Sequence, residues 1–413
     1  MSKIEKFRKG GFKWLFNSIS IRMKHKLNNY YFYHYQKKLP IQENLIVMES
    51  EGDLSDNAYA LYDYMRENGY LKKYQVVWLV DNISVSRKEN FPNTSFVYKN
   101  RYIHLDRKAN KALATCKWYI FDHNNEFIQI DKRREQKVIY LSHGWGYKAA
   151  KGNVSTKSFY DAITVTGDIP AKGMALFWNE PLSKTIITGY PRLDYFFKNN
   201  KVTEEKVNKK YHFDKYKKVI YWMPTFRQST SKELSEDYLQ NQTGLPIFET
   251  RESLKEFSEF LKKQNVLLVF KLHHLQAHLP VFKDHFENIL IVKDEEIKQL
   301  GMQLYQFINL SDAMISDYSS ISVDYLLKDR PIIFTLDDYE QYDKSRGLIP
   351  QNAIDYMPGY HVYNQKELEE SILEILQGID SYKEERKKLL PLYHKYNDGK
   401  SSQRVLNAIG IKN

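Results

Sequence analysis

The chain has 413 residues, of which 42% are hydrophobic and 27% charged, enough for two domains of ordinary size with separate cores. The single cysteine, Cys116, excludes an intrachain disulfide framework and a multi-cysteine zinc site, and it fits a reducing compartment. No run of about 18 apolar residues and no signal-peptide pattern occurs, so we expect no membrane-spanning segment.

The net charge of +11 is concentrated at the N-terminus, because residues 1–38 hold ten Lys or Arg against one acidic residue. This distribution argues against a nucleic-acid-binding protein with a basic groove. Apolar and aromatic residues alternate with the cations, which is typical of an amphipathic helix at an anionic membrane surface. The alternative is a terminal helix packed on the body with a solvated basic face. The apolar residues are Phe7, Phe12, Trp14, Leu15, Phe16, Ile19 and Ile21.

From Ile41 onward, short apolar runs alternate with helical patterns, which predicts an α/β fold. A lysine-rich segment, 198–218, interrupts the pattern and is interpreted as a linker. We therefore predict an arm at 1–40 and two doubly wound, Rossmann-type domains, 41–205 and 206–413, that face a cleft at the carboxyl ends of their strands. The expected strands are 45–48, 75–80, 95–98, 118–121, 138–141, 162–165 and 184–187, then 219–222, 266–270, 289–292, 313–316 and 331–334. Amphipathic stretches at 366–389 and 402–409 complete the chain.

Unusual residues follow several of these strands, where the cleft is expected. In the first half, Ser142 to Lys148 (SHGWGYK) and Thr188 to Asp194 (TGYPRLD) each come directly after a strand. In the second half, Met223 to Arg227 (MPTFR) and Lys271 to His274 (KLHH) are placed in the same way. Glycine lets a backbone approach a ligand closely, while lysine and arginine offer charge to phosphate.

The segment Ser311 to Arg346 predicts a strand, a turn, a helix and a second strand in close succession. Ser319 and Ser320 fall at the expected helix N-terminus, where unpaired backbone N–H groups and the helix dipole attract phosphate. The alternative is that both serines only cap the helix.

Other positions also carry two interpretations. His143 after a strand can be a catalyst or an ordinary structural histidine, and Arg227 can hold a diphosphate or form a surface ion pair. A zinc site from His273, His274 and His278 is disfavoured, because neighbours in an extended chain point to opposite faces. We predict no metal site.

As an ordered set, these motifs resemble the CDP-glycerol glycerophosphotransferase family of teichoic acid and capsule synthesis. The similarity spans roughly Tyr140 to Arg404, whereas the first 130 or so residues match only in general character. The motifs are His143-Gly144 with Lys148 and Gly152, Gly189 to Asp194, Pro224 to Arg227, Lys271 to His273, Asp317 to Ser320 with Asp324, Asp329 to Phe334, and Asn397 to Ser402.

The resemblance implies a GT-B-like fold, with a CDP-activated polyol bound mainly by the second domain and the acceptor by the first. It implies a peripheral enzyme at the cytoplasmic face of the cell membrane, near a lipid-linked glycan acceptor. No cofactor is implied, since the CDP-polyol is itself the donor substrate. The reaction implied is attack of an acceptor hydroxyl on the β-phosphorus of the donor, with release of CMP.

Roles for individual residues follow from that resemblance. His143 is expected to be the general base, and His273 with Lys271 and Arg227 to neutralise the diphosphate. Ser319 and Ser320 are expected to hold its oxygens. The remaining residues expected at the substrates are Gly144, Lys148, Arg192, Asp194, Thr225, Asp317 and Asp324, the last binding a polyol hydroxyl or orienting a serine.

One departure from the family pattern affects the acceptor side. Family members often have His-Gly-Thr-Pro before an apolar residue and Lys, whereas Trp145, Gly146 and Tyr147 stand here. Glycerol phosphate and ribitol phosphate both stay open as the transferred group. Two further alternatives are a GT-B glycosyltransferase that uses a nucleotide sugar and a catalytically silent membrane-associated scaffold.

Overall fold

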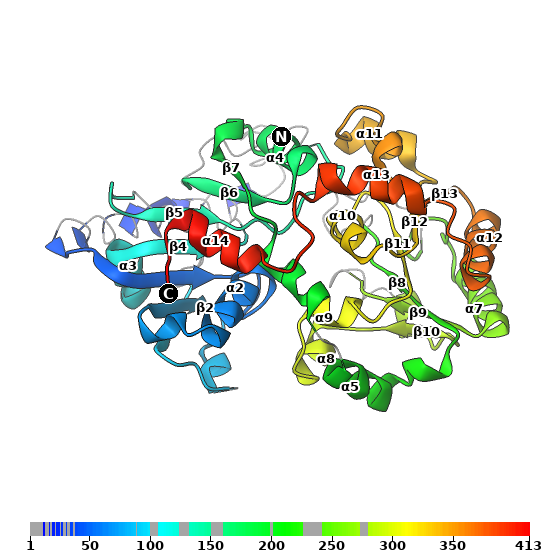
Figure 1. Cartoon of the computed structure of the whole chain (residues 1–413), viewed down its shortest axis with the longest axis horizontal. Helices are drawn as coiled ribbons and strands as arrows, with labels where there is room; N and C mark the ends of the chain where they lie inside the picture. The colour runs from blue at the N-terminus through cyan, green and yellow to red at the C-terminus, as the bar shows by residue number, and fades with distance from the viewer. Residues whose placement is uncertain are drawn as a thin grey trace. The chain divides into compact units, whose positions relative to one another are not determined.

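In the computed structural model, the described residues are scattered positions between 11 and 35, then 38–87, 89–99, 106–123, 132–149, 160–198, 201–225, 242–272 and 280–413. Two sheets organise this part of the chain (Figure 1). The helices are α2 (Asp56–Glu67), α3 (Arg107–Thr115), α4 (Asp168–Trp178), α5 (Lys201–Tyr211), α7 (Arg251–Gln264), α8 (Asp294–Gln299), α9 (Leu304–Ile308), α10 (Ser320–Tyr325), α11 (Tyr339–Arg346), α12 (Gln365–Leu376), α13 (Lys383–Tyr393) and α14 (Ser401–Ile409).

The first sheet has seven strands in the order β3-β2-β1-β4-β5-β6-β7, and its pairs from β3 through β6 are parallel. The strand order reverses between β1 and β4, because β2 and β3 extend the sheet to one side and β5 to β7 to the other. The strands are β1 (Gln42–Glu49), β2 (Gln75–Val80), β3 (Thr94–Tyr98), β4 (Cys116–Phe121), β5 (Lys137–Tyr140), β6 (Ala162–Val165) and β7 (Thr185–Ile187).

The second sheet has six parallel strands in the order β10-β9-β8-β11-β12-β13. Its order reverses between β8 and β11. In β9 all five residues are buried, as expected for a strand covered by helices on both faces. The strands are β8 (Lys218–Trp222), β9 (Val266–Phe270), β10 (Ile289–Ile291), β11 (Ala313–Ser316), β12 (Ile332–Thr335) and β13 (Tyr360–Val362).

Each sheet buries an apolar face under amphipathic helices. Residues of α2 and α14 complete the first core, where Trp118 Nε1 donates to the carbonyl of Ile409 at 3.1 Å. Figure 1 shows α14, in red, returning to the first sheet. Residues of α7 and α12 cover the second core. Helix α7 begins at a Thr250 cap, whose side chain accepts from the Ser253 N–H, and ends at left-handed Asn265.

The chain separates into two compact units. The first unit is Met1–His143, Lys157–Thr164 and Ser402–Asn413, and the second is Gly144–Thr156 and Val165–Ser401. The lysine-rich segment interpreted as a linker contains α5 and lies in the second unit. The domain limits drawn from the sequence stay predictions. Among the described residues, no helix has the length and apolar character that a membrane crossing requires.

Candidate functional site

Two predicted site residues meet at the strand reversal of the second sheet, the place where open α/β sheets bind ligands. Thr225 follows β8 and Asp317 follows β11. The Asp317 carboxylate accepts the Thr225 backbone N–H and hydroxyl, both at 2.7 Å, and the Ser319 N–H at 3.1 Å. Because Asp317 is fully buried, it joins the two loops rather than presenting a charge to solvent.

Ser319 and Ser320 begin helix α10 and are partly exposed. Ser319 occupies the N-cap position with an extended backbone, yet its side chain makes no capping hydrogen bond. The capping alternative for Ser319 is therefore not realised in this structure. Lys271, after β9, is held at the same edge of the sheet by an ion pair of 3.1 Å with Asp294.

Gly144 and Gly146 lie against this turn. A Cβ at Gly146 would stand 2.5 Å from the Tyr318 carbonyl oxygen and 2.8 Å from the Ser320 nitrogen. A Cβ at Gly144, which has φ of +101°, would stand 2.5 Å from the Arg192 guanidinium and 3.1 Å from Ser320. Both glycines therefore allow close packing of the loop onto protein atoms of the turn.

The tryptophan that departs from the family pattern packs against helix α4 in the second unit. Trp145 is 3% exposed, and a Cβ at Gly173 of α4 would stand only 2.2 Å from its ring. The Tyr147 hydroxyl donates to the Tyr356 carbonyl at 3.0 Å, and Lys148 forms an antiparallel bridge with Leu348. The altered residues thus fix the loop inside the second unit.

Arg192 and Asp324 form a buried ion pair beneath the same loop. The distance between Arg192 Nη2 and the Asp324 carboxylate is 2.7 Å, and the two side chains are 6% and 1% exposed. The guanidinium also stands over the Tyr305 ring, 4.8 Å from its centre, and the Tyr305 hydroxyl donates to Asp324. Arg192 therefore connects Gly144 to helix α10, and Asp324 orients Arg192.

Asp194 has a separate structural partner. Its carboxylate accepts the Ser401 N–H at 2.8 Å, and a Cβ at Gly189 would stand 2.4 Å from the Ser401 hydroxyl. The structure thus brings together the motifs 189–194 and 397–402, which are far apart in sequence.

His143 belongs to the first unit and is exposed. Its Nδ1 lies 3.2 Å from the Tyr140 hydroxyl. The preceding residue, Ser142, has a positive φ of +61°, and its carbonyl accepts the Asn57 side-chain amide at 2.8 Å. Tyr140 and Asn57 therefore determine where the imidazole points. His143 and Gly144 are consecutive, so the two groups of predicted residues are joined by the chain itself. His273 and Arg227 lie outside the described residues.

The strand reversal of the first sheet holds a charged cluster that the sequence analysis missed. Glu49 ends β1 and accepts the Tyr119 hydroxyl at 2.8 Å, and the His123 ring lies 3.5 Å from both the Glu49 and Asp122 carboxylates. Lys99 is buried beside them and donates to the Ser50 carbonyl at 2.7 Å. The signal available in the sequence was the charged residues at the ends of three strands: Glu49 as the last residue of β1, Lys99 directly after β3, and Asp122 with His123 directly after β4.

The charges of this cluster stabilise one another. Burial alone disfavours the imidazolium, but Asp122 and Glu49 outweigh it and raise the pKa of His123 to about 9. Burial raises the pKa of Asp122 to about 6. Burial also acts to raise the pKa of Glu49, but His123 and Lys99 outweigh it and hold that pKa below its usual value. At neutral pH the first strand reversal therefore carries a protonated histidine between carboxylates.

Comparison with known proteins identifies a family. The model of the family described as CDP-Glycerol:Poly(glycerophosphate) glycerophosphotransferase matches residues 31–410. The chain is 26% identical to the teichoic acid glycerol-phosphate primase of Bacillus subtilis (strain 168), covering 86% of this chain and 88% of that protein. It is 23% identical to the teichoic acid ribitol-phosphate primase of Bacillus spizizenii (strain ATCC 23059 / NRRL B-14472 / W23), covering 90% and 92%.

A solved structure supports the same fold. The wall teichoic acid polymerase TagF superposes with a TM-score of 0.71 at 20% identity, covering 99% of this chain and 98% of that one. The UDP-GlcNAc 2-epimerase of Neisseria meningitidis superposes with a TM-score of 0.52 at 12% identity, covering 89% and 100%. The predicted α/β fold with two parallel, Rossmann-type sheets, GT-B-like in type, is confirmed.

Proposed function

Since this chain belongs to the CDP-glycerol:poly(glycerophosphate) glycerophosphotransferase family, we propose that it transfers glycerol phosphate from CDP-glycerol to a hydroxyl of a teichoic acid precursor. The observation that supports this most is the extent of the family match, because residues 31–410 include every predicted site residue. Ribitol phosphate is the second candidate group, because relatives of both kinds cover most of the chain.

The reaction joins an acceptor oxygen to the β-phosphorus of the donor. The bond from that phosphorus to the bridging oxygen breaks, CMP leaves, and the acceptor proton passes to a base. Such a reaction depends mainly on positioning and on stabilising the phosphate charge. We assign the base to His143, because its imidazole is exposed and is oriented by Tyr140.

The donor phosphates are assigned to the strand reversal of the second sheet. Ser319, Ser320 and Lys271 lie at the carboxyl edge of that sheet, in the loops after β11 and β9. The hydrogen bond between Asp317 and Thr225 joins the loops after β11 and β8. Asp324 lies in α10, and its ion pair with Arg192 holds that helix in place. We also assign His273 and Arg227 to the donor phosphates, because both follow strands of the second sheet in the sequence.

The test separates the base from the donor site. His143→Ala should lower turnover by roughly 10² to 10⁴ with donor affinity nearly unchanged, because a general base acts on the acceptor. Lys271→Ala should weaken donor binding as well, because it removes a charge expected at the diphosphate. Turnover is measured by CMP release and donor affinity by calorimetry. Near wild-type turnover in His143→Ala contradicts the base assignment.

We also propose a peripheral position on the anionic cytoplasmic face of the cell membrane, near a lipid-linked acceptor. Six of the described residues of the arm are apolar, helical and 45–72% exposed, and they recur every three or four positions, which is the spacing of one face of an amphipathic helix. They are Phe12, Phe16, Ile19, Met23, Leu27 and Tyr30. Arg22, Lys24 and Lys26 add positive charge nearby.

Removal of residues 1–38 should abolish salt-sensitive binding to anionic vesicles and leave donor affinity intact. A milder variant replaces Phe16 and Met23 by Ser, since both are exposed and their loss leaves the charge unchanged. Sedimentation with phosphatidylglycerol vesicles measures the binding. Vesicle binding equal to that of the full chain in both variants contradicts a role for the arm.

A further inference from the structure

A hollow of about 450 Å³ opens in the second unit, and none of its lining residues belongs to the donor site proposed above. Leu267 near the start of β9 and the segment Phe286 to Leu290 around the start of β10 form its floor. It therefore lies at the amino ends of these strands, whereas Lys271 lies at the carboxyl end of β9. Leu267 and Lys271 are four positions apart along extended chain, roughly 13 Å. The hollow is distinct from the proposed donor site.

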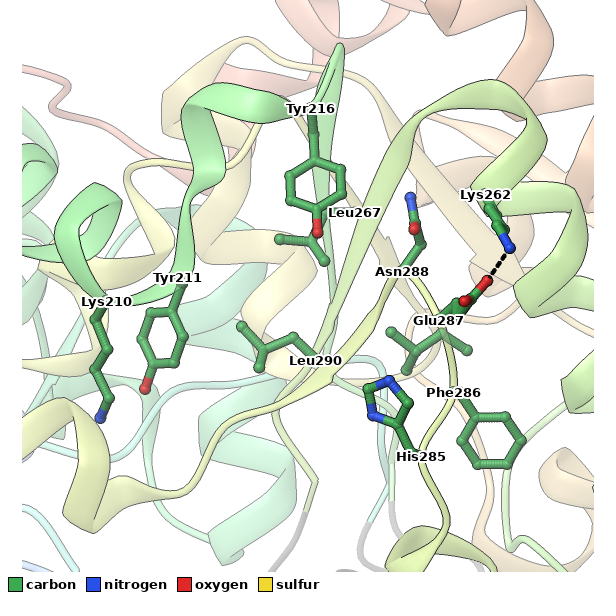
Figure 2. Close-up of a pocket in the computed structure, with 11 residues that line it drawn as sticks. Lys210, Tyr211, Tyr216, Lys262, Leu267, His285, Phe286, Glu287, Asn288 and Leu290 are labelled. Carbon is green, nitrogen blue, oxygen red and sulfur yellow. Dashed lines mark ion pairs between the residues drawn. The ribbon is translucent and has the colours of Figure 1, made fainter.

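Aromatic and cationic side chains line this hollow together. Lys210 and Tyr211, from the end of α5, stand on one side, and Lys262 with Glu287 on the other (Figure 2). Lys210 Nζ lies 4.9 Å from the centre of the Tyr211 ring and 3.8 Å from Glu296. Tyr216 and His285 contribute further rings, and His285 is exposed.

Two acidic residues moderate the charge at the hollow itself. Glu287 pairs with Lys262, and Glu296 faces Lys210. The adjoining segment 206–218 nevertheless holds six lysines and one acidic residue, Asp214, although Lys218 forms an ion pair of 3.1 Å with Asp312. The net charge of this segment is therefore +5.

Helix ends explain only part of this basic charge. Lys210 and Lys262 lie in the last turns of α5 and α7, where cations offset the negative end of the helix dipole. Lys215 ends the short 3-10 helix Phe213–Lys215, and Lys217 lies beyond it and is exposed, so no helix end accounts for Lys217. Asn265, at the end of α7, holds this segment against that helix, because its side chain donates to the Lys215 carbonyl at 3.1 Å.

We propose that this hollow and its lysines bind the polyol-phosphate chain itself, as an anchoring site separate from the point of transfer. The inference rests on the proposed function, which supplies the chemistry of the ligand. A polyol-phosphate chain alternates a phosphodiester charge with a short carbon backbone. Lysine and histidine suit the phosphodiester, and the faces of Tyr211, Tyr216 and Phe286 suit the carbon backbone. A concave site of this size suits a single strand better than a flat bilayer.

The test uses the full chain and a fluorescent oligomer of glycerol phosphate about six units long. Lys210→Glu should weaken oligomer binding, measured by anisotropy, about tenfold and make it less sensitive to salt. Tyr216→Ala should weaken binding without changing the salt dependence. CMP release with a single-unit acceptor should stay at the wild-type rate in both variants, because neither residue belongs to the proposed donor site.

Lys366→Glu is the matched control, since Lys366 forms an ion pair of 3.8 Å with Glu370 on α12, the same distance as the pair of Lys210. Oligomer binding that is equal in the Lys210 and Lys366 variants overturns the proposal. If Lys210→Glu loses vesicle binding but keeps oligomer binding, the proposal is also overturned, because the surface around the hollow then contacts a membrane. Anisotropy requires no turnover, so a wild-type chain that releases no CMP contradicts the proposed function separately.

Discussion

Removal of the Arg192 charge should destabilise the second unit strongly. In Arg192→Met the side-chain stem is retained, but the Asp324 carboxylate, 1% exposed, loses the cation that pairs with it and keeps the hydrogen bond from the Tyr305 hydroxyl. Breaking a buried pair in this way costs about 3–5 kcal/mol, because one charge stays buried without its partner. The lost stacking on Tyr305 adds about 1 kcal/mol.

The assay is urea denaturation followed by circular dichroism, with the free energy of unfolding extrapolated to water. Arg251→Met is the control, because Arg251 pairs with Asp284 at 2.5 Å but is 59% exposed, and exposed pairs contribute about 0–1 kcal/mol. Combining Arg192→Met with Asp324→Leu should cost less than the two single changes together, since no charge is then left unpaired. A loss in Arg192→Met no larger than in the control refutes the reasoning.

Three further predictions concern separate parts of the molecule. For His143 to accept a proton at Nε2, its other ring nitrogen must carry the hydrogen, and the Nδ1–H then donates to the Tyr140 oxygen at 3.2 Å. Tyr140→Phe removes this acceptor, so it should lower the rate of CMP release about tenfold or more. Donor affinity, measured by calorimetry, should stay unchanged. Changing Ser319 and Ser320 together to Ala should weaken donor binding by about 1–3 kcal/mol. A donor affinity equal to that of the wild-type chain would show that neither serine binds the donor. The pKa of His123 is raised from 6.5 to about 9, so the protonated ring adds about 3 kcal/mol to the free energy of unfolding. This contribution is complete below pH 6.5 and is lost as the pH rises through 9. His123→Gln should lack that decline in denaturation experiments between pH 6.5 and 9.5, and an identical decline would contradict the role of His123.

Most strands could be predicted from sequence, because parallel strands buried on both faces read as continuous apolar runs. The prediction for β2, 75–80, agrees with Gln75–Val80, and that for β9 with Val266–Phe270. Strand β13 was missed, since Tyr360–Val362 has three residues with a histidine in the middle. The predicted stretch 366–389 is two helices, α12 and α13, and Gly378, with φ of +78°, lies between them.

The sequence predicts which residues belong to the candidate site, but it does not predict which of them contact one another. The residues after β8 and β11 were identified because the carboxyl ends of strands are where such sheets bind ligands. The interpretation of Gly144 as a residue facing a ligand did not anticipate its packing on Ser320, because the turn at 318–320 is distant in sequence. Glu49 and His123 were missed for the same reason, since each is an isolated polar residue until β1 and β4 pair.

Product analysis with defined donors tests the central claim most directly. The purified chain is incubated with a teichoic acid precursor and with CDP-glycerol, CDP-ribitol or a UDP-sugar, and the released nucleotide is identified by chromatography. We predict release of CMP from a CDP-polyol, with a matching gain of one polyol phosphate on the acceptor and no reaction of the UDP-sugar. Release of a nucleoside diphosphate from the UDP-sugar, with no CMP from either CDP-polyol, would contradict the account.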